Sequence, residues 1–482
     1  MAFGSLLFTY VFLPLALFAV YAAKGAKSRN AVLLAASLCF FAWGAPKFVF
    51  ALVALCAMDY ALSKGIARAG SASGRAKALC AFGVAANLAV LAFFKYTDFA
   101  IDSANAILRL AGAPELRHAG ILLPLGISFF TFQKISYLVD VRRGVSKPAE
   151  TFWKYLLYIA LFPQLILGPI IRYHEIEHQL DDRATNAEGF LSGLWRFALG
   201  FARKMLVAGP LALVADAAFD ASAAGRALTA PAAWAGLYAY TLQIYFDFAG
   251  YSDMAVGIGR MLGFKFPENF NAPYVSRDMA EFWRRWHMTL GGFMKEYLYI
   301  PLGGNRCPRA RSLFNNWLVF LASGIWHGAA WNFVAWGAWH GLWIMVAKLR
   351  KTKFPARFAA RHLPAMAFTL LMAMLGWVFF RAATFHDAAT YFASLFSKGG
   401  ATNADTLLAQ GGPHALAALA VGTFFAFAPA LLPRLGLAEW EISGEGKRGE
   451  VFARTFLTAL LILLSTLPLL ASGFNPFIYF RF

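Results

Sequence analysis

Stretches of apolar residues long enough to cross a lipid bilayer recur along almost the whole chain, from Gly4 to Ser472, with no extended polar segment between them. A helix needs about 20 mostly apolar residues to cross a ~30 Å hydrocarbon layer. Of the residues, 60% are hydrophobic and only 14% are charged, whereas about a quarter are charged in an ordinary soluble domain. The sequence therefore predicts an all-α, polytopic membrane protein.

We expect about eleven membrane-spanning helices in a single domain over residues 1–472. The expected spans are residues 4–22, 31–46, 48–63, 78–94, 120–139, 155–171, 229–247, 313–349, 364–380, 414–432 and 455–472. The stretch 313–349 is long enough for two helices, and a weaker span lies near 195–218. The first span has no basic segment before it and no small-residue cleavage site after it, so we expect it to stay as a helix rather than be removed as a signal peptide.

Basic residues cluster in short loops between the expected spans, and they give the chain a formal net charge of +19. The clusters lie within residues 24–29, 64–77, 348–361 and 447–454. Short loops rich in Lys and Arg stay in the cytoplasm, so both the N-terminus and the C-terminal tail 473–482 are expected on the outer side. Anionic lipid headgroups account for this charge without a nucleic-acid partner.

The sequence contains one metal-site pattern, which we do not expect to bind metal. Residues 174–178 read H-E-I-E-H and match the H-E-x-x-H motif of zinc proteases. The motif lies in the polar stretch 172–183, outside any expected span, so we predict a surface loop there. The four cysteines form no C-x-x-C pair, which gives no sign of a zinc site or a disulfide framework.

Polar residues within apolar segments are expensive in a membrane and therefore mark candidate functional sites. They are densest between Asp247 and His340. His327 interrupts an apolar run as W-H-G, at a depth where a neutral imidazole costs far less than a charged one, which favours a base. The stretch 281–300, with His287, is too polar to face lipid, and it fits a helix that lines a cavity or re-enters the membrane. For His340 we expect a structural hydrogen bond.

Six segments of the chain resemble the membrane-bound O-acyltransferases, and within them the bacterial alginate and peptidoglycan O-acetyltransferase branch. They are LLPLGISFFTFQKISYLVDVRRG at 122–144, LFPQLILGPIIRY at 161–173, IYFDFAGYSDMAVGIGRMLGFKFPENFNAPY at 244–274, FWRRWHMTL at 282–290, YLYIPLGGNR at 297–306 and WHGAAWNFVAWGAWHG at 326–341. The resemblance implies a helical core with a through-membrane tunnel in the bacterial inner membrane. It also implies that the family's histidines fall on His327 and His287, which are 40 residues apart.

The resemblance further implies acetyl-CoA as a cytoplasmic donor, no permanently bound cofactor, and an envelope polysaccharide as final acceptor, reached through an extracytoplasmic SGNH-hydrolase-like acetyltransferase. The tail FIYFRF at 477–482 resembles a C-terminal motif of related systems whose tyrosine carries the acyl group, which would make Tyr479 a relay. An interfacial aromatic anchor is the simpler explanation of this tail. The chemistry favours His327 as general base, Tyr479 as acyl acceptor, and His287 as the group that positions or polarises the thioester carbonyl.

Two other classes of protein remain open at this point. A polytopic transporter of an envelope precursor would also combine many spans with buried polar residues, although the chain lacks the paired repeats that are usual in transporters. An intramembrane zinc protease would use residues 174–178. Acetyl transfer from acetyl-CoA separates the enzyme from the transporter, and bound zinc identifies the protease.

Overall fold

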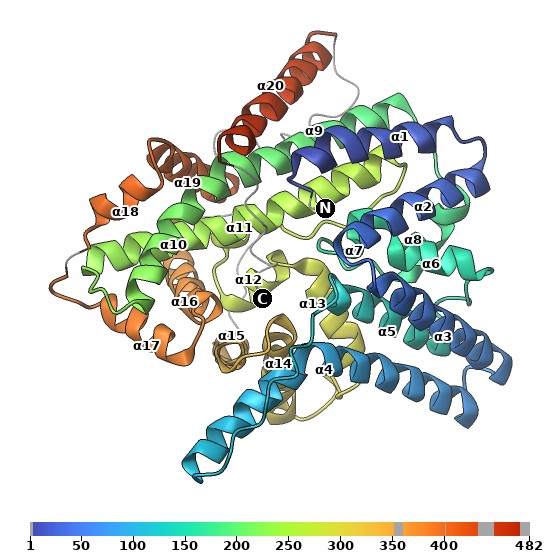
Figure 1. Cartoon of the computed structure of the whole chain (residues 1–482), viewed down its shortest axis with the longest axis horizontal. Coiled ribbons are helices and arrows are strands. Elements are labelled where there is room, and N and C mark those ends of the chain that lie inside the picture. Colours follow the sequence, from blue (N-terminus) through green and yellow to red (C-terminus); the bar gives the residue numbers. More distant parts are fainter. Residues whose placement is uncertain (1–2, 351–359, 401, 432–447, 473–482) are drawn as a thin grey trace. The chain divides into compact units, whose positions relative to one another are not determined.

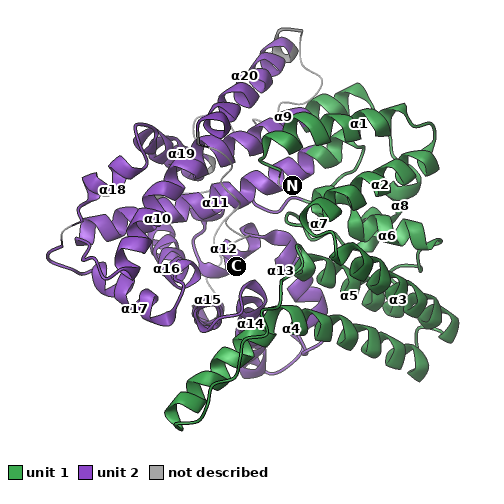
Figure 2. Ribbon diagram, in the orientation of Figure 1, with its two compact units in different colours: residues 1–193, 258–267 green, residues 194–257, 268–482 purple. Residues whose placement is uncertain are grey.

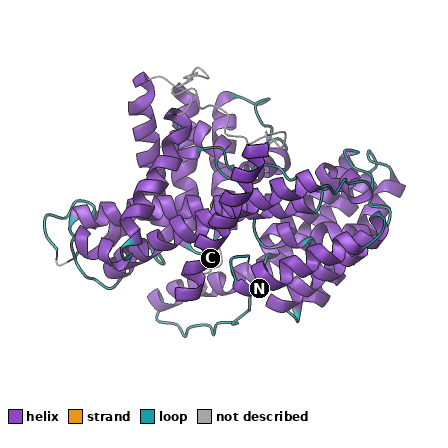
Figure 3. Ribbon diagram, turned by 90° about the horizontal axis from the view of Figure 1, so that it is seen from above, coloured by secondary structure: helices purple, strands orange, loops and turns teal. Residues whose placement is uncertain are grey.

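The computed structural model describes residues 3–350, 360–400, 402–431 and 448–472. These residues form helices joined by loops (Figures 1 and 3), and they contain no β-strand, only one isolated bridge between Leu228 and Thr402. The chain divides into two compact units (Figure 2). Unit 1 comprises residues 1–193 and 258–267, and unit 2 comprises 194–257 and 268–482. The expected all-α class is confirmed.

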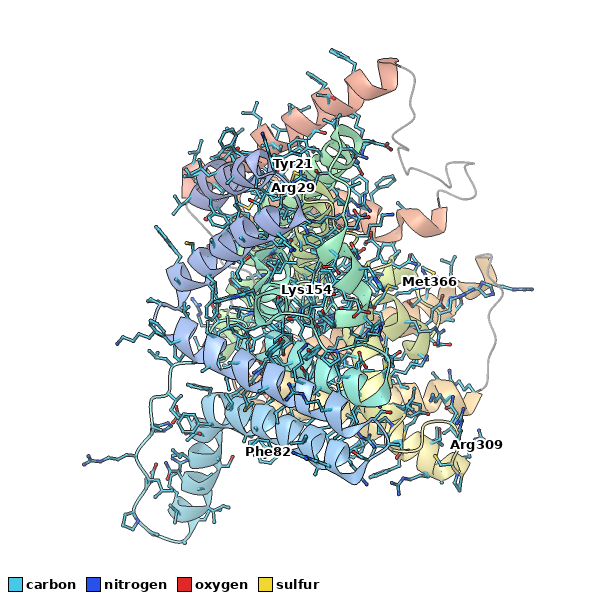
Figure 4. The ribbon with its side chains drawn as sticks, turned by 90° about the vertical axis from the view of Figure 1, so that its right-hand side faces the viewer. Tyr21, Arg29, Phe82, Lys154, Arg309 and Met366 are labelled. Atoms are coloured by element: carbon cyan, nitrogen blue, oxygen red, sulfur yellow. The ribbon has the colours of Figure 1, made fainter. Side chains whose placement is uncertain are left out.

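Unit 1 is built from the N-terminal helices. They are η1 (Phe8–Phe12), α1 (Leu13–Ala22), α2 (Ala26–Gly44), α3 (Phe48–Ala69), α4 (Gly74–Leu110), α5 (Ile127–Arg143), α6 (Phe152–Ala160), α7 (Phe162–Leu165), α8 (Tyr173–Asp181) and the start of α9 (Ala187–Ala202). Phe82 of α4, labelled in Figure 4, is 60% exposed, and in a membrane protein such apolar side chains face lipid.

The core of unit 1 holds an ion pair where α3 and α5 pack together. Lys134 Nζ lies 3.3 Å from Asp59 Oδ2, and both side chains are at most 1% exposed. Asn87 of α4 donates a hydrogen bond of 2.9 Å to Asp59 Oδ1. Around them, Tyr137 stacks on Tyr155 with ring centroids 4.4 Å apart. Charges are buried only when they are paired, and this pair ties three helices together.

Unit 2 contains the remaining elements. They are the rest of α9, η2 (Arg203–Ala208), α10 (Gly209–Ala223), most of α11 (Ala230–Met261), η3 (Pro273–Val275), α12 (Met279–Arg285), α13 (Met288–Met294), η4 (Lys295–Tyr299), α14 (Arg309–His327), α15 (Trp331–Arg350), η5 (Ala360–His362), α16 (Leu363–Arg381), α17 (Phe385–Ser394), α18 (Ala404–Gln410), α19 (His414–Leu431) and α20 (Arg448–Ser472). An aromatic-rich core joins α10, α11, α12, α15 and α16.

Within the described ranges, five helices have the length and apolar composition needed to cross a membrane: Phe48–Ala69, Gly74–Leu110, Ala187–Ala223, Leu363–Arg381 and Phe452–Ala471. The pair α18 and α19, bent by 96°, adds a sixth if it counts as one span. The chain is therefore a multi-pass membrane protein. The number of eleven spans and the single domain over 1–472 stay predictions, and the tail 473–482 lies outside the described residues.

Two expected spans are wrong as continuous helices. The expected span 155–171 is broken into the short helices α6 and α7, because Pro163 has no N–H and its ring would clash with a carbonyl of the preceding turn. The expected span 120–139 becomes helical only at Ile127. Gly126 before it has a left-handed φ of 76°, and a Cβ there would lie 2.5 Å from the carbonyl oxygen of Leu165. The expected pair of helices in 313–349 is confirmed as α14 and α15, separated after His327.

Candidate active site

His327 is the last residue of α14, and close packing of α14 against α15 fixes its place. Two glycines allow the close approach: a Cβ at Gly324 would lie 2.3 Å from the carbonyl oxygen of Phe333, and one at Gly337 would lie 2.5 Å from that of Phe320. Small residues at helix contacts let backbones approach closely in membrane proteins. The glycine after His327 is equally constrained, because its Cβ would meet the Phe333 ring at 2.1 Å.

Aromatic rings form the walls around the His327 imidazole, which is 6% exposed. The ring centroid of Trp336 on α15 lies 4.9 Å away at an interplanar angle of 83°, and that of Phe380 on α16 lies 5.4 Å away. Trp326 adds a third edge-on contact at 4.8 Å. Apolar walls of this kind exclude water, which strengthens any hydrogen bond or charge interaction made inside them.

His287 lies at a break in the backbone between α12 and α13. It is the N-cap of α13 and has φ 46° and ψ 53°, a left-handed conformation that is uncommon for a residue with a side chain. The loop after α11 holds this turn, since the Met288 N–H donates a hydrogen bond of 2.9 Å to the carbonyl oxygen of Asn269. The predicted re-entrant stretch 281–300 is thus two short helices and a π-helical turn, and His287 marks the break.

The structure brings His287 and His327 together within unit 2, with ring centroids 6.5 Å apart and both side chains buried. Phe248 of α11 packs edge-on against His287 at 4.7 Å. Two buried imidazoles at this distance are candidates for proton transfer at one reacting centre. The third predicted site residue, Tyr479, lies outside the described residues.

His340 differs from the other two histidines. Its ring lies among the indoles of Trp283, Trp336 and Trp377 at centroid distances of 5.1, 5.0 and 5.8 Å. Within the described residues neither of its ring nitrogens has a hydrogen-bond partner, so the expected structural hydrogen bond is not found. Gly376 leaves room for the ring, because a Cβ there would lie 2.4 Å from Nε2. His340 supports the site by packing, since Trp336 contacts both it and His327.

Sequence reasoning missed the ion pairs made by α11, the helix whose Phe248 packs against His287. Asp253 of α11 pairs with Arg196 at 2.6 Å and with Arg203, and Lys204 pairs with Asp247 at 2.6 Å. Both acceptors belong to the segment YFDFAGYSD, and two of the donors begin the π-helical turn η2. Such turns occur often near functional sites. The density of polar residues from Asp247 onward pointed to this segment of the chain. Spacing along the sequence, however, does not identify ion-pair partners that are 40 to 60 residues away.

The H-E-I-E-H motif forms a helix, so the predicted surface loop is wrong. Residues 173–181 are α8, at whose start the Glu175 carboxylate accepts a hydrogen bond of 2.8 Å from the Arg172 backbone N–H. His174 Nδ1 lies 2.9 Å from Asp140 Oδ2, while the His178 side chain is 92% exposed. Nearby, Lys154, labelled in Figure 4, pairs with Asp181 at the end of this helix. No group of three or more potential metal ligands occurs among the described residues.

Two buried imidazoles in an aromatic setting within a helical membrane protein form a candidate site for proton transfer. The family model described as membrane-bound O-acyltransferase matches residues 149–386. The chain is 38% identical to the probable alginate O-acetylase AlgI of Pseudomonas putida, with all of both chains covered. It is 36% identical to the peptidoglycan O-acetyltransferase of Helicobacter pylori, over 80% of this chain and 78% of that protein.

A more distant relative is the teichoic acid D-alanyltransferase of Bacillus subtilis, 28% identical over 45% of this chain and 57% of that protein. The chain therefore belongs to the membrane-bound O-acyltransferase family and is an O-acyltransferase. This result decides against the transporter and the zinc protease.

Proposed function

We propose that this protein moves acetyl groups from acetyl-CoA in the cytoplasm across the bacterial inner membrane, for O-acetylation of an exported or envelope polysaccharide. The observation that carries the proposal is the buried pair His287 and His327, with ring centroids 6.5 Å apart in an aromatic enclosure. Relatives named for acetylating alginate and peptidoglycan support the acetyl group and the polymer class.

His327 acts as the general base. It takes the proton of the Tyr479 phenol as the phenolic oxygen attacks the thioester carbonyl of acetyl-CoA, and it returns that proton to the departing CoA thiolate. His287 positions or polarises the carbonyl. The aryl ester formed on Tyr479 has a good leaving group, so it remains able to pass acetyl to a hydroxyl of a separate SGNH-hydrolase-like transferase, which modifies the polymer.

A pocket in unit 2 supports an anionic donor that enters from the cytoplasm. It has a volume of about 290 Å³ and lies between the ends of α12, α15 and α16, with Arg277 and Arg350 in its lining beside Trp343 and Phe368. Arg350 ends α15 and begins the basic stretch that the charge pattern assigns to the cytoplasm. Arg277 pairs with Glu281 at 2.9 Å, and Asp278 also lines the pocket. The guanidinium of Arg350 beside the Phe368 ring is therefore the group that suits a phosphate of coenzyme A.

The experiment measures release of CoA from acetyl-CoA by the purified full-length protein in proteoliposomes, together with transfer of labelled acetyl to the protein. We expect His327→Ala to abolish both and His287→Ala to reduce both strongly. The matched control is His386→Ala, because His386 is exposed on α17. Wild-type protein that releases no CoA, or a His327→Ala variant as active as the control, overturns the proposal.

A further inference from the structure

The strongest observation that the proposed mechanism leaves unused is the set of hydrogen bonds around Asn269. This residue lies in the loop after α11 and is 1% exposed. Its Oδ1 lies 3.1 Å from Nδ1 of His287 and accepts hydrogen bonds from the Thr289 hydroxyl at 2.9 Å and the Thr289 backbone N–H at 3.3 Å. Its Nδ2 donates to the Ser252 hydroxyl at 3.2 Å.

These contacts determine which way the amide of Asn269 faces. A backbone N–H can only donate a hydrogen bond, so the side-chain atom that accepts from the Thr289 N–H is the oxygen. An amide oxygen in turn can only accept. The Nδ1 atom of His287 therefore carries a hydrogen and donates it to Asn269. In the neutral imidazole the lone pair then lies on Nε2.

The Nε2 atom of His287 is buried and has no hydrogen-bond partner among the described residues. A buried polar atom without a partner costs free energy, and such atoms in a native fold call for a functional explanation. The rings that pack against His287 are those of Phe248, Trp326 and His327. Within the described chain His327 is the titratable group among them, and no carboxylate, lysine or arginine bonds to His287.

We propose that Asn269 is a positioning residue that holds His287 as the Nδ1–H tautomer, so that the Nε2 lone pair is available in the site as a hydrogen-bond acceptor or base. The proposal rests on the proposed function and refines it: of the two roles given to His287 there, positioning remains and polarisation of the carbonyl is excluded. A neutral His287 in this tautomer cannot donate to a thioester carbonyl from Nε2. Its role becomes that of an acceptor, which orients the attacking hydroxyl together with His327. Thr289 and Ser252 fix the Asn269 amide and hence the direction of the imidazole.

The first test reads the tautomer directly and does not depend on acetyl transfer. The full-length protein is labelled with ¹⁵N-histidine in proteoliposomes, and the His287 signals are assigned by difference from His287→Gln. The ¹⁵N chemical shifts distinguish a protonated from an unprotonated ring nitrogen. We expect protonated Nδ1 and unprotonated Nε2 in the wild type and loss of this single pattern in Asn269→Leu. Protonated Nε2 in the wild type, or an unchanged pattern in Asn269→Leu, overturns the inference.

The second test uses the pH dependence of CoA release. We expect Asn269→Leu to lower kcat by about 10²-fold, as expected when a base is misaligned. Asn269→Asp keeps an acceptor oxygen beside Nδ1 but adds a negative charge, which favours the imidazolium. If activity needs neutral His287, the loss of activity on acidification then begins at a higher pH, and the acid limb of the profile moves up by about 1 to 3 pH units.

The matched controls are Asn271→Leu and Asn271→Asp, on the same loop, where the Asn271 side chain is exposed. We expect both to keep the wild-type profile.

A role that is only structural predicts equal loss in Asn269→Leu and Asn269→Asp with no shift of the acid limb, and that result overturns the inference. If Asn269→Asp instead extends activity to higher pH, the imidazolium is the active form and the acceptor role is wrong. If the tautomer signals are as expected but the protein releases no CoA, Asn269 remains the positioning residue and the proposed acetyl transfer fails.

Discussion

The buried ion pair of unit 1 gives the sharpest test of how this protein is held together. Lys134→Met removes the cation and leaves the Asp59 carboxylate enclosed, with Asn87 still donating to it. Breaking a buried pair by removing one partner costs about 3–5 kcal/mol, because a charge is left without compensation. That cost changes the unfolding equilibrium by about two to more than three orders of magnitude, at about 1.4 kcal/mol for each factor of ten.

The double variant Asp59→Asn with Lys134→Met separates charge burial from the loss of contacts. It leaves no buried charge, and replacing both members of a buried pair with neutral groups is often close to neutral in stability. We therefore expect the double variant to recover most of the stability that Lys134→Met loses. The control is Arg109→Met in the same unit, where Arg109 and Glu115 form a pair 3.1 Å apart with side chains 60% and 49% exposed. An exposed pair contributes about 0–1 kcal/mol.

The assay is equilibrium unfolding in mixed micelles with an increasing fraction of sodium dodecyl sulfate, followed by tryptophan fluorescence. Lys134→Met should shift the midpoint strongly, Arg109→Met only slightly, and the double variant should lie near the wild type. A Lys134→Met variant as stable as Arg109→Met, or a double variant less stable than Lys134→Met, would refute the reasoning, since either result means that charge pairing does not control this core.

Two further predictions concern the relay tyrosine and the His174 ion pair. Tyr479→Phe should abolish polymer acetylation and labelled acetyl on the protein while protein abundance stays normal, since it removes the acceptor oxygen and keeps the ring that a membrane anchor needs. Mass spectrometry of a C-terminal peptide should find acetyl on Tyr479 of the wild type. Normal acetylation by Tyr479→Phe would exclude the relay. The Asp140 carboxylate, through its hydrogen bond, raises the pKa of His174 above its ordinary value of 6.5 despite partial burial. That stabilisation is complete below about pH 6.5 and is lost as pH rises through the raised folded pKa. Thermal unfolding across this window should show the loss in wild type and not in His174→Gln, and identical pH dependence in the two would count against the pair.

Helix boundaries show how far local sequence rules reach. That residues 313–349 hold two helices and that α19 starts at residue 414 were predicted, because the length and the apolar composition of a segment are local properties. The breaks at Pro163 and Gly126 lie in segments as apolar as any span, so mean hydropathy does not detect them. Residues 173–181 form a helix that begins where the Glu175 carboxylate accepts a hydrogen bond from the Arg172 backbone N–H, although their polarity favoured a loop.

The sequence by itself determined that the chain is a helical membrane protein, and it marked His287 and His327 as candidate site residues. Apolar segments favour the membrane and polar side chains within them are costly, whatever the fold. Only the tertiary structure decided that these two rings meet, that Trp336 links His327 to His340, and that Asn269 faces His287. Residues that are 18 and 40 positions apart in sequence come together through helix packing. A tautomer depends on the direction of one hydrogen bond, and that direction exists only once the surrounding backbone is in place.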